Sequence, residues 1–173
     1  MHSDLRRGQA VVEFALVVPI VALLLFGGLY TTILISGDIK AGYAVRAGVR
    51  LATELGGRQS NPTASTPEID AKIVSNVLAV MQSTTYVVID EVDIYAASSS
   101  DGTMQPGDLA DAFDGTGRPL AVQTLPLELR LQSPPDETSL GVRLRWHYTT
   151  PLVGFGSVAT STYAVMRCAP ITS

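Results

Sequence analysis

The chain has 173 residues, of which 46% are hydrophobic and 16% are charged, and its formal net charge is -4. This length leaves room for one membrane anchor and one small domain. The acidic balance argues against a nucleic-acid partner, because phosphate binding requires clustered Lys and Arg side chains.

A polar start and a long uncharged run form the first pattern in the chain. Arg6 and Arg7 precede Gly8, and no charged residue occurs between Phe14 and Gly37. As a helix this run would be roughly 36 Å long, against about 30 Å for the hydrocarbon core of a bilayer. The apolar core of a secretory signal is usually only about 7 to 15 residues long. The run therefore predicts a membrane helix that the mature protein retains.

Glu13 lies at the edge of this run. An ionised carboxylate near hydrocarbon costs several kcal/mol unless it finds a partner. Two interpretations remain open from the residues alone: a carboxylate paired with a cation, or an interfacial carboxylate among the lipid headgroups.

The spacing of these residues resembles the cleavage site of type IV prepilins. Gly8 is followed by Gln9, and Glu13 is the fifth residue after the glycine, with Phe14 beside it. Within that superfamily, residues 12–19 look like the TadE-like minor pilins, or pseudopilins, of tight-adherence (Flp) pili.

A second stretch carries the same resemblance. Residues 44–52 are similar to the alanine, arginine and glycine pattern that follows the family's membrane helix. Ala47 departs from the pattern, since an acidic residue is common at that position in the family. The two stretches together cover roughly the first third of the chain.

The resemblance implies a structural rather than an enzymatic protein. A prepilin peptidase would expose an α-amino group with a pKa of about 8, which would pair with the acidic residue of a neighbouring subunit. The implied partners are the peptidase, other pilins and minor pilins, the inner-membrane assembly platform and membrane lipid, with no nucleic acid, cofactor or metal. The residues given these roles are Gly8 and Gln9 at the processing site, Glu13 as the amine-pairing carboxylate, Arg6, Arg7 and Phe14 in the leader and flanking motif, Pro19 at a helix bend, and Arg46, Gly48 and Arg50 as candidate subunit contacts.

The same resemblance implies a location. The protein would be a single-pass protein of the inner (cytoplasmic) membrane with an external C-terminal domain, and would reach the pilus at the cell surface after assembly. Counting of Lys and Arg does not fix this orientation, because Lys40, Arg46 and Arg50 outnumber Arg6 and Arg7. Since the family's major subunits are very short, the domain favours a minor pilin that acts in initiation, at the tip or in regulation, for adhesion or secretion. The alternative is a signal-anchored surface binding module that does not polymerise.

The first helix is expected to continue from Asp38 to about Leu55. Pro19 removes one helical hydrogen bond, which favours a bend, although proline is also tolerated in membrane helices. Four-residue spacing predicts an apolar row on the domain and a charged row towards solvent or a neighbouring subunit. The apolar row comprises Ile39, Tyr43, Ala47, Leu51 and Leu55, and the charged row comprises Arg46, Arg50 and Glu54.

A second helix is expected after Gly56-Gly57 and a loop rich in Ser, Pro and Thr. Ser65 or Thr66 would start it, with Pro67 in the first turn. Its buried face would consist of Ile69, Ile73, Val77 and Val80.

Alternation of apolar and polar residues predicts about four antiparallel strands after Ser83. Asp90 would interrupt the first strand, and the second and third would form a hairpin with a turn at residues 133–136. The strands are expected around Tyr86, Val88, Val92 and Ile94; around Leu125, Leu127, Leu129 and Leu131; around Val142, Leu144, Trp146 and Tyr148; and from about Val158 to Met166.

The predicted fold is α+β and type IV pilin-like, with a long N-terminal helix, a short second helix and an antiparallel sheet of about four strands. The predicted boundaries are a leader at 1–8, a transmembrane and assembly helix at 9–37, its extramembrane continuation at 38–57 and a globular domain at 58–173.

Patterns for catalysis or metal binding are poor. His147 is one of only two histidines, so histidine-based nucleophilic catalysis has little to build on. Four aspartates lie in a glycine-containing loop without the spacing of an EF-hand, which predicts a solvated acidic loop, with a calcium site as the alternative. They are Asp101, Asp108, Asp111 and Asp114.

Cys168 is the only cysteine, which excludes an intrachain disulfide and a zinc site built from thiolates. The expected state is a half-buried free thiol. An intermolecular disulfide outside the membrane is the alternative.

Overall fold

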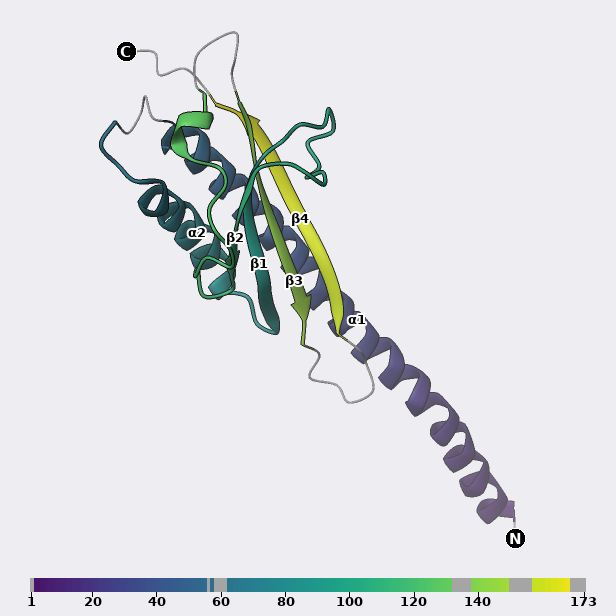
Figure 1. The fold of residues 1–173 in the computed structure, drawn as a ribbon. Coiled ribbons are helices and arrows are strands. Elements are labelled where there is room, and N and C mark those ends of the chain that lie inside the picture. The colour runs from purple at the N-terminus through teal and green to yellow at the C-terminus, as the bar shows by residue number, and fades with distance from the viewer. Residues whose placement is uncertain (1, 56, 58–61, 132–137, 150–156, 169–173) are drawn as a thin grey trace. The chain divides into compact units, whose positions relative to one another are not determined.

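The computed structural model describes residues 2–55, 57, 62–131, 138–149 and 157–168. The chain separates into two compact units, Met1–Ser36 and Gly37–Ser173. The elements in chain order are α1 (His2–Leu55), α2 (Thr66–Gln82), β1 (Val87–Ala96), β2 (Ala110–Asp114), the 3-10 helix η1 (Leu127–Leu129), β3 (Ser139–Tyr148) and β4 (Val158–Arg167) (Figure 1). The predicted α+β class is confirmed.

The first unit consists of the N-terminal part of α1, which continues through Pro19. Two hydroxyls in this part bond to the carbonyl one turn earlier: Thr31 to Gly27 at 2.8 Å and Thr32 to Gly28 at 2.9 Å. Hydroxyls that bond to their own helix need no water. Thr31 and Thr32 are therefore compatible with an apolar surrounding.

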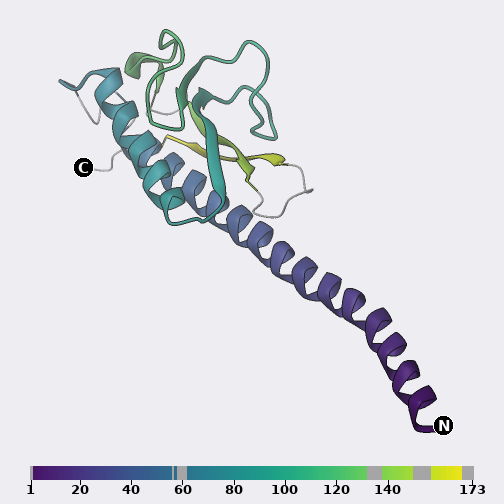
Figure 2. The ribbon, with the colours of Figure 1, turned by 90° about the horizontal axis from the view of Figure 1, so that it is seen from below.

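The sheet of the second unit has the order β2-β1-β3-β4, and every neighbouring pair is antiparallel. α2 and the part of α1 from Gly37 onward lie on one face of this sheet (Figures 1 and 2). The side chains of β3 that point to this face are apolar, so the core lies between the sheet and the two helices. They include the predicted residues Val142, Leu144, Trp146 and Tyr148, all buried.

The part of α1 that follows Gly37 buries a face different from the predicted one. Of the predicted row, Ile39 and Tyr43 are 54% and 62% exposed, whereas Ala47, Leu51 and Leu55 are half-buried. The buried face is made of small and medium-sized residues, namely Gly37, Ala41, Ala44, Val45, Gly48, Val49, Ala52 and Thr53. Small side chains let the helix approach its neighbours closely: a Cβ added to Gly48 would lie 2.5 Å from Val77 Cγ2 of α2. Packing distance, rather than hydrophobicity, decides which side of the helix is inside.

The predicted start of α2 is confirmed. Ser65 is the N-cap, Pro67 lies in the first turn, and the backbone N–H of Ser65 donates to Glu68 at 2.9 Å. The buried face differs from the prediction in two ways: it includes additional residues, and Val80 is only half-buried. It consists of Ile69, Asp70, Ile73, Val74, Val77, Leu78 and Met81.

Three of the four predicted strands are confirmed as β1, β3 and β4, and Asp90 interrupts β1 as expected. The strand predicted around Leu125–Leu131 is wrong, and so is its hairpin with β3. Only η1 forms there, and β3 pairs with β1 and β4. The fourth strand is β2, inside the predicted acidic loop. The turn predicted at residues 133–136 lies outside the described residues.

Arg130 explains this failure, because its side chain turns inward to a buried ionic cluster with Asp70 of α2 and Asp111 of β2. The guanidinium donates to both Asp70 oxygens at 2.7 and 3.1 Å and to Asp111 Oδ2 at 3.3 Å. It also donates to the carbonyl of Leu125 at 2.8 and 3.2 Å. All three charged side chains are fully buried. Such a network offsets the desolvation of its charges only when the hydrogen bonds are this complete.

The packing of α1 predicts that Gly48→Ala lowers the free energy of unfolding by about 1 to 3 kcal/mol, because the new methyl group overlaps Val77 in a packed interface. Gly42→Ala is the matched control, since nothing lies within 4 Å of a Cβ added there. That change should stabilise the chain by about 0.5 to 1 kcal/mol through helix propensity. Urea unfolding in detergent, followed by fluorescence of the single tryptophan, Trp146, measures both effects. Equal stabilisation by the two changes would contradict the close packing.

The buried cluster predicts one contribution to stability, that of Asp70, that increases as the pH falls. Desolvation raises the pKa of Asp70 to about 6, although Arg130 acts in the opposite direction. The folded state therefore binds this proton more tightly than the unfolded state, whose Asp70 has a pKa of about 4. The resulting stabilisation is complete below about pH 4 and is lost as the pH rises through about 6. Its size is on the order of 2 to 3 kcal/mol.

Asp70→Asn should remove this contribution, which urea midpoints measured between about pH 4 and about pH 7 would reveal. Asp114→Asn is the control of opposite sign, because the hydroxyl of Thr116 and neighbouring N–H groups lower the pKa of Asp114. The stability contributed by Asp114 is lost as the pH falls. A pH profile that Asp70→Asn leaves unchanged would contradict the prediction.

Candidate functional site

α1 carries the residues of the predicted processing site. Gly8 and Gln9 lie in helical backbone shortly before Glu13, and the Glu13 carboxylate is exposed. The large apolar side chains next to it are exposed as well: Phe14, for example, is 70% exposed. This part of the helix therefore presents a carboxylate on a mainly apolar surface.

Glu13 has a partner that the sequence did not predict. Gln9 Nε2 donates a hydrogen bond to Glu13 Oε1 at 3.0 Å. The four-residue spacing places both side chains on one face of the helix. A neutral amide brings no compensating positive charge, so this bond solvates the carboxylate but does not neutralise it. The four-residue spacing of Gln9 and Glu13 is the sequence pattern from which this contact could have been inferred.

The same helix has the properties of a membrane anchor. The segment Val11–Leu55 is long and apolar enough to cross a bilayer by its length and composition. Its N-terminal part exposes large apolar side chains such as Leu23 and Leu24, at 71% and 73%. Such a surface is unfavourable in water and favourable in lipid or against other apolar helices. These properties fit a membrane-anchored protein.

The three candidate subunit contacts after the apolar run have different surroundings. Arg46 and Arg50 are exposed, and Arg50 Nε lies 2.9 Å from Glu54 Oε1. Because both partners of this ion pair are largely exposed, it contributes little stability. Gly48 instead packs inside the domain, against Val77. Only the two arginines therefore present side chains that a neighbouring molecule can reach.

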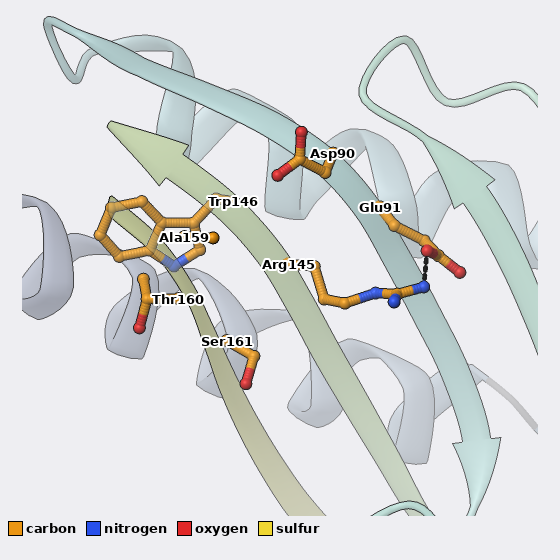
Figure 3. A pocket seen from close by; sticks show the side chains of 7 residues that line it. All are labelled: Asp90, Glu91, Arg145, Trp146, Ala159, Thr160 and Ser161. Atoms are coloured by element: carbon orange, nitrogen blue, oxygen red, sulfur yellow. Dashed lines mark ion pairs between the residues drawn. The ribbon is translucent and has the colours of Figure 1, made fainter. Parts of the chain in front are cut away.

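β1 contains a bulge that directs two successive carboxylates into one cleft. Ile89 pairs with Trp146 and Glu91 pairs with Arg145, which leaves Asp90 without a pairing residue of its own. Side chains normally alternate between the two faces of a strand, and an extra residue interrupts the alternation. Asp90 and Glu91 therefore both line a cleft of about 430 Å³ that also includes residues of β3 and β4 (Figure 3).

The charged side chains at this cleft are paired across β1 and β3. Arg145 forms an ion pair with Glu91 (dashed line in Figure 3), and His147 Nδ1 lies 2.8 Å from Asp90 Oδ1. β4 contributes hydroxyl groups, among them that of Ser161. Since each of these four charged or titratable side chains already has a cross-strand partner, strand pairing accounts for their arrangement. The sequence did not indicate that a bulge in β1 provides the partner of His147.

The four aspartates of the predicted acidic loop do not converge on one point. Three of them, Asp101, Asp108 and Asp114, accept hydrogen bonds from nearby N–H and hydroxyl groups, which lower the pKa of each carboxyl. The fourth, Asp111, was expected in solvent but is the buried partner of Arg130. Within the part of the chain that the structure describes, no group of three or more metal-ligating side chains occurs.

Cys168 is 0% exposed and is therefore more deeply buried than the half-buried thiol that the sequence predicted. A fully buried sulfur cannot reach a second chain without local opening of the fold. The structure thus disfavours the alternative of an intermolecular disulfide.

The fold and the N-terminal helix together define a class of protein. A long apolar helix with an exposed carboxylate precedes an α+β domain with a four-stranded antiparallel sheet. This arrangement is consistent with a pilin-like fold in a membrane-anchored protein.

One comparison with known families gives a match, and it covers the N-terminal quarter of the chain. Residues 8–50 match the family model of the TadE-like proteins, which confirms the resemblance drawn from the two N-terminal stretches. No curated protein and no solved structure matches the chain. The match indicates a pilin-like protein associated with Tad pili. This class is structural rather than enzymatic, and its members interact with other pilus components.

Proposed function

We propose that the protein is a minor pilin, or pseudopilin, that enters a tight-adherence pilus or its assembly complex through its N-terminal helix. It would act in initiation, at the tip or in regulation, in support of adhesion or secretion. The observation that carries the proposal is the TadE-like match that begins at residue 8, combined with Glu13 exposed on an apolar helix. A contact between subunits can provide such a carboxylate with a hydrogen-bonded or cationic partner in place of water.

The proposed assembly step begins with cleavage by a prepilin peptidase between Gly8 and Gln9. Glycine before the cut needs no side-chain pocket and allows the protease to approach the backbone. The new α-amino group has a pKa of about 8 and is mostly cationic at neutral pH. It then pairs with Glu13 of a neighbouring subunit, so that two charges that would each be costly alone enter the apolar interior together. Glu13 thereby sets the register, and apolar helices supply the packing.

The proposed location is the inner membrane, with the C-terminal domain outside the cytoplasm and the assembled protein at the cell surface. In this arrangement residues 1–8 are a cytoplasmic leader that contains Arg6 and Arg7, residues 9–37 span the membrane, and residues 38–57 and 58–173 are external. The partners are the peptidase, other pilins, the inner-membrane assembly platform and lipid.

Two features of α1 suit a move from bilayer to filament. Pro19 lacks the N–H of a normal helical hydrogen bond, which makes this position a soft point where helices can repack. The side chains of Arg46 and Arg50 are exposed and can contact acidic groups of neighbouring subunits, Arg50 in exchange for its ion pair with Glu54. Phe14, also exposed, adds apolar area next to Glu13.

Processing after Gly8 predicts a mature chain that starts at Gln9. N-terminal sequencing and intact mass of the protein from its native membrane, with and without its prepilin peptidase, measure this directly. Gly8→Val should cause accumulation of the uncut chain, because the side chain obstructs the protease. Gly28→Val, a matched change within the apolar helix, should leave the cut intact. A chain that starts at Met1 with and without the peptidase would favour a signal-anchored surface binding module.

The register role predicts that Glu13→Ala lowers incorporation into pili by about tenfold or more, the equivalent of at least about 1.4 kcal/mol for one lost ion pair. The ratio of the protein in purified pili to that in membranes is the measurement. Asp38→Ala is the control, because Asp38 is an exposed carboxylate of the same helix just beyond the apolar run. Equal incorporation of Glu13→Ala and the wild type would refute the register role.

A further inference from the structure

We infer that the hydrogen bond between Gln9 and Glu13 protects the mature N-terminus from cyclisation, and so preserves the positive charge on which assembly depends. The inference rests on the proposed processing after Gly8. It assigns Glu13 a role within its own chain, as a positioning residue for Gln9, that precedes its role between subunits.

An N-terminal glutamine carries an intrinsic side reaction. The lone pair of its α-amine attacks Cδ of its own side chain, a bond forms between the nitrogen and Cδ, and the bond between Cδ and Nε2 breaks. Nε2 leaves as ammonia, with a proton that comes from the amine. The product is a neutral lactam, which cannot pair with a carboxylate. Cyclisation of Gln9 would therefore remove the cation that the neighbouring Glu13 needs.

The geometry of the helix opposes this reaction. Ring closure requires the side chain of Gln9 to fold back onto its own backbone nitrogen. In the structure the amide extends instead to the next turn, where Nε2 lies 3.0 Å from Glu13 Oε1. A carboxylate acceptor also increases the electron density of the amide, which makes Cδ a poorer electrophile. Both effects slow the attack, and they are larger in an apolar surrounding than in water.

The same bond serves Glu13 before assembly. The carboxylate lies among exposed apolar side chains, where a missing hydrogen-bond donor is costly. Gln9 supplies a neutral donor from within the chain. The amine of a neighbour can then replace it, because a charged donor binds a carboxylate about twice as strongly as a neutral one.

The test compares mature chains of the wild type, Glu13→Leu and Glu13→Gln in detergent. Each chain is produced with the prepilin peptidase and incubated at mildly alkaline pH, where the α-amine is largely uncharged and nucleophilic. The cyclised fraction is read from the intact mass, which decreases by one ammonia, and from resistance to N-terminal sequencing. Leucine removes the acceptor, whereas glutamine keeps an acceptor oxygen without the charge. Val17→Leu is the matched control, because it adds apolar volume about two turns away from Gln9.

We expect cyclisation of Glu13→Leu to be roughly two- to tenfold faster than that of the wild type, with an intermediate rate for Glu13→Gln. Val17→Leu should cyclise at the wild-type rate. If Glu13→Leu is not processed, the comparison of Glu13→Gln with the wild type decides the question. Equal rates in chains that start at Gln9 would overturn the inference and leave the proposed processing intact. Chains that all start at Met1 would overturn the proposed processing, and the inference with it.

Discussion

One helix has to suit two surroundings, and the composition of α1 changes accordingly. Before Gly37 its large apolar side chains are exposed, as a lipid or helix-packed environment requires. After Gly37 its inward face is reduced to small residues such as Ala44 and Gly48. The small face lets the large residues of the sheet, above all Trp146, fill the core beside the helix. Close approach of backbone to sheet is thus the condition on which the packing of the domain depends.

Much of the fold follows from local patterns, and the exceptions have a common physical origin. The length of α1, the cap of α2 and the alternation in β3 depend on neighbours in sequence, so they could be predicted. The leucine alternation from Leu125 to Leu131 is equally regular, yet no strand forms there. Its outcome is decided by Arg130, whose partner Asp70 is 60 residues away. The alternation of apolar and polar residues cannot predict such an ion pair, because it contains no information on charged residues that are distant in sequence.

The inward face of α1 was mispredicted for a related reason. Ile39 and Tyr43 are more hydrophobic than the alanines that are actually buried. A ranking by hydrophobicity therefore selects the wrong side of the helix. Of the candidate site, the spacing of Gly8 and Glu13 was visible in the sequence. The cleft at Asp90 was not, because a bulge appears only once the register of β1 against β3 is known.

The chain provides hydrogen-bond partners for its carboxylates in two different ways, and the two ways differ in whether the partner can be exchanged. Asp70 and Asp111 share Arg130, a cation held permanently inside the domain, and the result is a fixed connection between distant elements. Glu13 accepts a hydrogen bond from the neutral amide of Gln9 in its own chain. A permanent cation would neutralise Glu13 and leave it no affinity for a second one. A neutral donor occupies the carboxylate without supplying a positive charge. In the proposed assembly, the carboxylate needs this property so that the α-amine of a neighbouring subunit can pair with it.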